Sequence, residues 1–163
     1  MTDFEGLVQR LHGAGVRYVL VGGFAGTVHG SPRITVDLDI VYARDAANLD
    51  RLARALEPLA PYLRGAPAGL PFKLDVPTLV RGLNFTLTTA MGDLDLLGEV
   101  AGGGSYEQLL AHTSRIHVFG TDIDVVTLAQ LIRLKRAAGR PKDLEAVAEL
   151  EVLLEERDRD RRD

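Results

Sequence analysis

Residues 21–41, VGGFAGTVHGSPRITVDLDIV, carry the strongest indication of the fold of this chain. It opens with the pair Gly22-Gly23 directly after an apolar run, and thirteen residues separate this pair from Asp37. Around Asp37 and Asp39 the residues alternate between apolar and polar, which is the period of a β-strand. The alternation predicts a strand over residues 35–41 that points both aspartates to one face. The other face of this strand would carry Val36, Leu38 and Ile40.

A second strand with paired aspartates follows later in the chain. Residues 83–88 and 93–97 both have strand-like patterns, and residues 89–92 connect them as a hairpin turn. The second of these strands places Asp93 and Asp95 on a common face. Asp95 lies further into the strand, whereas a Gly-Asp pair also suits a turn, so Asp93 is the weaker ligand candidate.

The rest of the first 80 residues predicts helices around these strands. Helical spacing of apolar residues, with caps and breakers, indicates helices over residues 3–12, 24–29 and 46–57, and a buried strand over residues 18–21. The Pro- and Gly-rich segment 61–79 is interpreted as a loop with a short strand at Phe72–Leu74.

The C-terminal part predicts a hairpin followed by helices. Gly102–Gly104 is interpreted as a flexible joint, Ser105 as the cap of a helix to His112, and residues 116–119 and 123–126 as a hairpin. Thr127 should cap a helix that ends near Ala138. The last helix should bury the stripe Leu144, Val147, Leu150 and Leu154, and residues 155–163 should form a solvated, fraying end.

Length and composition limit the class of protein. With 163 residues and 46% hydrophobic content, we expect a single domain over 1–163, with a core of about 16–126 and a C-terminal helical segment of about 127–157. The net charge of −4 and the scattered Lys and Arg residues do not form the basic footprint of a dedicated nucleic-acid binder, although a nucleic-acid substrate stays open. Zero cysteines exclude disulfides and thiolate chemistry, so a metal would need carboxylates or His.

The sequence shows neither a membrane-spanning stretch nor a signal peptide, and both observations concern the cellular location of the protein. No apolar stretch is long enough to cross a bilayer, and the N-terminus MTDFEGLVQRLH lacks the basic start and apolar run of a signal peptide. We therefore expect a cytoplasmic protein without a membrane partner. The four His residues lie on separate elements, so a His-based metal site is not expected.

The aspartates and glycines fit one kind of chemistry. Two Asp residues two apart on a strand place their oxygens side by side, and a third from a neighbouring strand completes a set of hard ligands for Mg²⁺. A Gly-Gly pair at a strand end lets the backbone approach phosphates closely. Phosphoryl and nucleotidyl transfer need this combination, because the protein mainly positions the triphosphate and neutralises its charge.

The same residues carry a resemblance. The 21–41 stretch and the later GDLDLLGEV resemble the signature of the DNA polymerase beta superfamily of nucleotidyltransferases, which has Gly-Gly, a spacer, an Asp-apolar-Asp strand and a third carboxylate strand. The chain is most similar to small bacterial and archaeal members, including AbiEii-type toxins and minimal enzymes paired with HEPN proteins. LIRLKRAAGRPKDLEAV resembles their C-terminal helical segment, so the similarity covers residues 16–150.

The resemblance implies a nucleotidyltransferase fold, an α/β (α+β) architecture with a mixed β-sheet flanked by helices and with C-terminal helices. It implies that Asp37, Asp39 and Asp95 are the catalytic and metal-binding residues, with Mg²⁺ or Mn²⁺ as the cofactor. Gly22, Gly23, Arg33, Thr35 and Lys135 are the candidate nucleotide-binding residues, since Arg33 and Thr35 fit the Arg-x-Thr-x-Asp pattern and Lys135 lies where relatives have a basic residue.

The function that follows is transfer of a nucleoside monophosphate from a nucleoside triphosphate, ATP among them, to a hydroxyl. The acceptor stays open between an RNA end such as tRNA, a partner protein and a small molecule. A place in a toxin–antitoxin or defence system, and a homo-oligomeric state, are compatible with the resemblance.

Other interpretations stay open from sequence alone. The fold could serve as a catalytically silent binding subunit or antitoxin, or the chain could be an unrelated mixed α/β domain. Asp37 and Asp39 could be the solvated face of an edge strand, with Arg33 paired to one of them. Lys135, Arg140 and Lys142 could be ordinary cations at helix ends.

Overall fold

A seven-stranded mixed sheet runs through the centre of the computed structural model, which describes residues 1–163. The strands are β1 Tyr18–Val21, β2 Asp37–Tyr42, β3 Tyr62–Leu63, β4 Phe85–Thr89, β5 Gly92–Leu97, β8 Thr113–Val118 and β9 Thr121–Val126. Their order in the sheet is β3-β4-β5-β2-β1-β9-β8. The pairs β2/β5 and β1/β9 are parallel, and the other neighbours are antiparallel.

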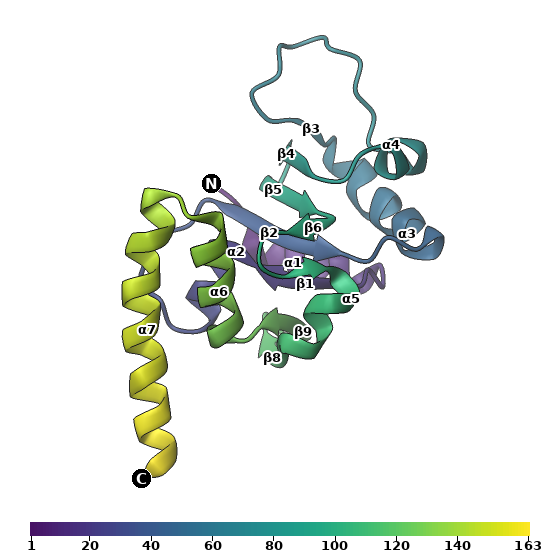
Figure 1. Ribbon diagram of the computed structural model, residues 1–163. Helices are drawn as coiled ribbons and strands as arrows, with labels where there is room; N and C mark the ends of the chain where they lie inside the picture. Colours follow the sequence, from purple (N-terminus) through teal and green to yellow (C-terminus); the bar gives the residue numbers. More distant parts are fainter.

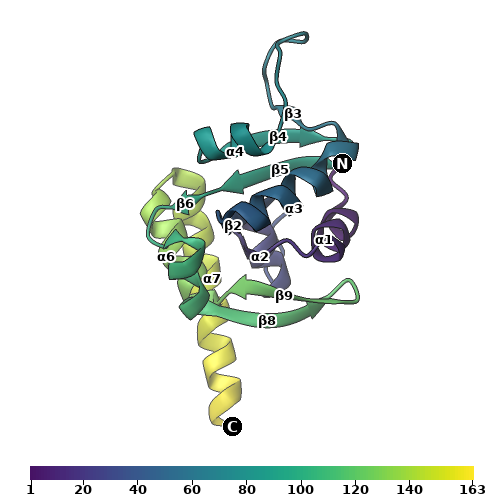
Figure 2. The same cartoon turned by 90° about the vertical axis from the view of Figure 1, so that its right-hand side faces the viewer.

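Seven helices surround this sheet (Figure 1). They are α1 Phe4–Gly13, α2 Gly22–Val28, α3 Ala46–Leu56, α4 Val76–Arg81, α5 Tyr106–Leu109, α6 Leu128–Ala138 and α7 Pro141–Arg162, with 3-10 turns at Glu57–Leu59 and Leu110–His112. Helices α6 and α7 pack side by side near the beginning of β2, and α3 follows its far end (Figures 1 and 2). None of the helices combines the length and apolar character needed to cross a membrane.

The alternation in β2 separates the core from the site. Leu38 and Ile40 are completely buried, whereas Asp37 and Asp39 on the other face keep partial exposure. Because β2 lies between β1 and β5, its polar face is at the centre of the sheet and not at an edge. Buried apolar residues from the strands and from the helices, α6 and α7 among them, form one cluster of 37 residues, so the two C-terminal helices are packed onto the same core as the sheet.

The strand predicted over residues 35–41 begins later than expected. β2 runs from Asp37 to Tyr42, and Val36 is 66% exposed instead of lying in the buried face. The pairing of β2 with β1 explains this later start, because β1 ends at Val21 opposite Asp39 and the chain then enters α2. Residues before Asp37 therefore have no partner on the β1 side.

The segment predicted as a loop over residues 61–79 contains more regular structure. A short strand, β3, pairs with β4, and α4 begins at Val76, while Phe72–Leu74 forms no strand. The Asp75 side chain accepts a hydrogen bond from the Thr78 N–H, and the proline in the first turn of α4 needs no hydrogen bond there. The intervening chain stands away from the body (Figure 1).

The glycine run predicted as a flexible joint is packed. Strands β6 Glu99–Val100 and β7 Gly104–Ser105 pair as a small hairpin around it. A Cβ on Gly103 would lie 2.7 Å from a Leu134 methyl group, so glycine is needed here because α6 lies so close.

The predicted cap at Thr127 is confirmed, whereas the last helix differs from its prediction. Thr127 accepts a hydrogen bond from the Gln130 N–H and α6 ends at Ala138 as expected. In α7, Leu144 is 52% exposed and Ala146 takes its place in the buried stripe. The helix continues to Arg162, through the residues predicted to fray.

Candidate metal and nucleotide site

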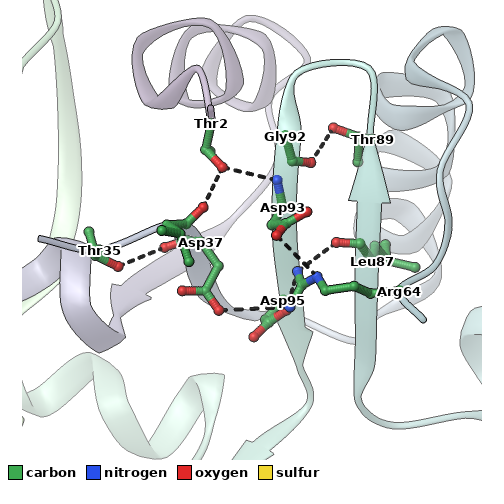
Figure 3. Close-up of polar contacts among 10 residues, drawn as sticks. Thr2, Thr35, Asp37, Arg64, Leu87, Thr89, Gly92, Asp93 and Asp95 are labelled. Carbon is green, nitrogen blue, oxygen red and sulfur yellow. Dashed lines mark hydrogen bonds and ion pairs between the residues drawn. The ribbon is translucent and has the colours of Figure 1, made fainter.

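Asp37, Asp39 and Asp95 meet on one face of the sheet. Strands β2 and β5 are parallel, and their register pairs Asp37 with Asp93 and Asp39 with Asp95. One carboxylate oxygen from each of Asp37, Asp39 and Asp95 lies within 4.8 Å of the other two. We call these three residues the carboxylate cluster. Figure 3 shows Asp37 and Asp95 side by side on their two strands.

Gly22 makes room for this cluster at the end of β1. Its φ of +72° is a left-handed conformation that side chains with a Cβ rarely adopt. A Cβ there would lie 1.9 Å from Asp39 Oδ2, well inside contact distance. The tight turn therefore brings backbone directly against the Asp39 carboxylate, which only glycine permits.

Gly23 and Thr35 form the next part of the same turn. A Cβ on Gly23 would lie 2.7 Å from Thr35 Oγ1, and that hydroxyl donates a hydrogen bond of 3.3 Å to the Asp37 carbonyl oxygen. The hydroxyl thus links the chain before β2 to the strand that carries Asp37.

The three carboxylates open into a cavity of about 550 Å³. All eight residues selected from the sequence line it, namely Gly22, Gly23, Arg33, Thr35, Asp37, Asp39, Asp95 and Lys135. The opposite wall comes from α6 and α7 and includes Lys135, Arg140 and Lys142, which we call the cationic corner. The cavity therefore has an acidic side on the sheet and a basic side on the helices.

An internal anion neutralises part of the cationic corner. The Asp143 side chain is only 2% exposed, its Oδ2 accepts a hydrogen bond of 2.6 Å from Arg140 Nε, and its Oδ1 lies 3.8 Å from Lys135 Nζ. Asp143 Oδ2 also accepts from the Arg140 N–H at the start of α7. These contacts lower the pKa of the Asp143 carboxyl, although burial opposes them as the largest single influence. Sequence reasoning missed Asp143, because its burial depends on how α6 packs on α7.

A solved structure of another protein has a similar arrangement of strands and helices. A protein from Thermotoga maritima, described as a "putative nucleotidyltransferase", superposes with a TM-score of 0.54 and 16% sequence identity, and the match covers 96% of each chain. The chain has a nucleotidyltransferase fold. Its sequence matches no protein-family model and no curated protein. The mixed sheet flanked by helices that the sequence predicted is thereby confirmed.

Within this nucleotidyltransferase fold, burial and mutual repulsion change the acidity of the cluster. Burial raises the pKa of Asp39 to about 8, and the neighbouring charge of Asp37 adds to the increase. Burial also raises the pKa of Asp95, against a hydrogen bond from Asp39 and the charge of Arg64. A cation between the carboxylates would offset this repulsion, so the site favours positive charge.

Arg64 is a second residue that sequence reasoning missed. It follows β3 and contacts three aspartates, with Nη2 2.9 Å from Asp95 Oδ1, Nε 3.4 Å from Asp93 Oδ2 and Nη1 3.8 Å from Asp37 Oδ2 (Figure 3). Arg64 lies in the Pro- and Gly-rich segment that was interpreted as loop, and no local pattern connects it with the aspartates.

The structure decides two of the alternatives that the sequence left open. Asp37 and Asp39 belong to an interior strand, so their interpretation as an edge-strand face is wrong. Arg33 pairs with Glu149 of α7, with Nε 2.7 Å from Oε2, and not with either aspartate. This pair connects the chain before β2 to α7 across the cavity.

Asp93 and His29 lie beside the site and outside it. Asp93 is neither part of the carboxylate cluster nor among the residues that line the cavity. His29 is buried, its Nε2 lies 2.7 Å from the Val126 carbonyl oxygen, and Arg157 approaches its Nδ1 at 3.2 Å. Burial lowers the pKa of His29, so the neutral ring serves to fix the end of α2 against β9 and α7.

Proposed function

We propose that this protein is a divalent-metal-dependent nucleotidyltransferase that moves a nucleoside monophosphate from a nucleoside triphosphate to a hydroxyl acceptor. The observation that carries the proposal is the convergence of Asp37, Asp39 and Asp95 beside Gly22, in a cavity whose opposite wall is basic. Carboxylates alone would suit many cations, whereas an acidic and a basic wall facing each other suit a metal–triphosphate complex.

The donor set fits Mg²⁺ or Mn²⁺. Oxygen ligands of Mg²⁺ lie at about 2.1 Å from the ion, so they are separated by roughly 3 to 4.2 Å in octahedral geometry. The separations within 4.8 Å in the carboxylate cluster are close to that range. When bound, the metal supplies charge neutralisation of the phosphates and a link between them and the carboxylates. We propose Mg²⁺ as the cofactor, with Mn²⁺ as its substitute.

The remaining residues of the chain would position the triphosphate and move one proton. Gly22 and Gly23 bring the backbone against Asp39 and Thr35 at the wall of the cavity, and the cationic corner faces the outer phosphates. The acceptor oxygen forms a bond to the α-phosphorus, its proton passes to the Asp95 carboxylate, and the bond to pyrophosphate breaks. Burial raises the pKa of Asp95, which favours its action as that base.

Arg33 and Thr35 have supporting positions in this proposal. Thr35 lies against Gly23 and Asp37, where its hydroxyl can turn toward a bound phosphate. Arg33 keeps one guanidinium edge on Glu149 while it lines the cavity. We propose that both residues contact the nucleotide.

We further propose that the acceptor is an RNA end, a protein or a small molecule. The sequence resemblance points to toxin–antitoxin and defence systems as the setting for this reaction.

Calorimetric titration tests the proposal. The purified protein would be titrated with ATP, GTP, CTP and UTP, with and without Mg²⁺, and compared with the Asp37→Asn, Asp39→Asn double variant. The expected result is triphosphate binding that needs Mg²⁺ and that falls about 100-fold or more in the double variant. Asp50→Asn serves as the control, since Asp50 is an aspartate of α3 that pairs with Arg54 and lies outside the cluster. Absence of triphosphate binding by the folded wild type would favour the silent binding subunit.

A further inference from the structure

Arg64 contributes a fixed positive charge to the carboxylate cluster. Its Nη2 donates a hydrogen bond of 2.9 Å to Asp95 Oδ1, and its Nη1 lies 3.8 Å from Asp37 Oδ2. Both aspartates belong to the set of three that could hold a metal ion. Figure 3 shows the guanidinium reaching from the β3 side across β4 to these two carboxylates.

The position of Arg64 is set by the sheet. Its backbone N–H donates a hydrogen bond of 3.0 Å to the Thr86 carbonyl oxygen, which attaches the residue to β4. Its Nη2 also donates to the Leu87 carbonyl oxygen at 2.6 Å, and the side chain is only 29% exposed. Arg64 is therefore part of the site and not a mobile surface cation.

A guanidinium and a divalent cation compete for the same oxygens. Both need the lone pairs of Asp37 and Asp95, and two positive charges a few ångströms apart in a partly buried site repel each other strongly. Without a metal, the guanidinium offsets the repulsion among the carboxylates. With a metal, the same contacts become unfavourable.

Asp93 offers Arg64 a second partner. Its Oδ2 lies 3.4 Å from Arg64 Nε, and Asp93 is neither in the carboxylate cluster nor on the cavity wall. Arg64 can thus leave Asp37 and Asp95 without losing every anionic contact. This gives Asp93 a use that the proposed reaction does not require.

We propose that Arg64 is a resident counterion that occupies the carboxylate cluster until a divalent cation displaces it onto Asp93. The proposal rests on the proposed function in one respect, because it takes the cluster as a cation site. Metal binding is then an exchange of one cation for another. The affinity of the protein for Mg²⁺ is therefore lower than it would be without Arg64. Removing Arg64 must therefore weaken the metal-free protein and strengthen its metal binding.

The test measures both quantities on Arg64→Gln and on wild type. Urea unfolding without metal should show a lower midpoint for the variant, since the three carboxylates lose their counterion. Calorimetric titration with Mn²⁺ and with Mg²⁺ should show an affinity about tenfold higher for the variant than for wild type. Arg54→Gln is the matched control, because Arg54 is an exposed arginine on α3 that pairs only with Asp50, and it should leave the metal affinity unchanged.

The outcomes separate this proposal from a structural role and from failure of the proposed function. A purely structural Arg64 would lower stability and metal affinity together, so an equal or weaker affinity in Arg64→Gln overturns the counterion proposal while wild-type binding stands. Absence of Mg²⁺ and Mn²⁺ binding in both proteins overturns the metal site and the counterion with it. If Arg64→Gln does not fold, Arg64→Lys, which keeps the charge but loses the planar fork, should still bind metal more tightly than wild type; an unchanged affinity would overturn the proposal.

Discussion

The acidic and basic sides of the cavity manage their charges in different ways. On the basic side, Asp143 is almost fully buried between Arg140 and Lys135, so part of the positive charge is neutralised from within the α6–α7 pair. On the acidic side, Asp37 and Asp95 pair with Arg64, which follows β3, and Asp39 has no ion-pair partner. The basic side therefore keeps an excess of positive charge, from three cations against one carboxylate, whereas the acidic side keeps an excess of negative charge that a metal ion can neutralise.

The difference suggests which side changes on ligand binding. Helix α7 begins with Arg140 and Asp143 bonded to each other, so the basic side has its geometry before any triphosphate arrives. The acidic side gains the most from a cation, because burial and repulsion raise the pKa of Asp39 to about 8. We expect the sheet face to respond to metal and the helices to remain fixed.

The largest effect is expected where the acidic side meets the backbone. Gly22→Ala introduces a Cβ that would lie 1.9 Å from Asp39 Oδ2, at a φ of +72°. The strain and the clash together should lower the free energy of unfolding by about 3 kcal/mol and abolish divalent-metal binding. Urea denaturation and metal titration measure both effects.

Gly13→Ala is the matched control for this substitution. A Cβ at Gly13 meets nothing within 4 Å, and its position at the end of α1 is exposed. This variant should stay within about 0.5 kcal/mol of wild type. Equal stability losses in the two variants would show that the Gly22 turn has no special tie to Asp39.

A smaller loss is expected on the basic side. Asp143→Ala removes the buried carboxylate that bonds to Arg140 and caps α7, which should cost about 2 kcal/mol of unfolding free energy. Asp50→Ala removes a carboxylate from a surface pair with Arg54 and should cost no more than about 0.5 kcal/mol. Chemical denaturation of both variants provides the comparison, and a loss at Asp143 no larger than at Asp50 would contradict the buried neutralisation.

The two sides should also differ in the sign of their pH dependence. The Asp39 pKa is raised from 3.8 to about 8, so between these values the unfolded chain has released a proton that the folded protein retains. Stability of the metal-free protein should therefore fall as pH rises from about 4 to 8. The lowered pKa of Asp143 acts in reverse, since its contribution is present above about pH 4 and is lost as pH falls below that value.

Asp39→Asn separates these contributions. Urea unfolding at pH 5 and at pH 8 should show a smaller difference in the variant than in wild type, because the titrating group is gone while Asp143 remains fully ionised at both values. The same pH difference in both proteins would assign the effect to other groups.

Local sequence patterns predicted which side chains share a face of a strand, but they do not predict which strands pair. Strict alternation placed Asp37 and Asp39 on one face, and Gly22-Gly23 with the later Asp95 indicated which residues would meet. That they do meet depends on the parallel pairing of β2 with β5, which joins residues more than fifty positions apart and has no local signal. The resemblance to known signatures supplied that link.

The residues that were missed all depend on long-range packing. Arg64 follows a two-residue strand in a Pro- and Gly-rich segment, so nothing near it indicates contact with three aspartates. From the sequence, Asp143 is an ordinary acidic residue in the first turn of a helix. Its burial results from the packing of α6 on α7. Val36 continued an alternating pattern, yet it lies outside β2 because the neighbouring strand had already ended.

The most direct test of the metal site is anomalous diffraction from crystals soaked with Mn²⁺ and a non-hydrolysable nucleoside triphosphate. A Mn²⁺ peak is expected within about 2.3 Å of oxygens from Asp37, Asp39 and Asp95, with the phosphates between this peak and the cationic corner. A well-ordered triphosphate without a peak at these aspartates, or a peak at other carboxylates only, would contradict a metal site at Asp37, Asp39 and Asp95.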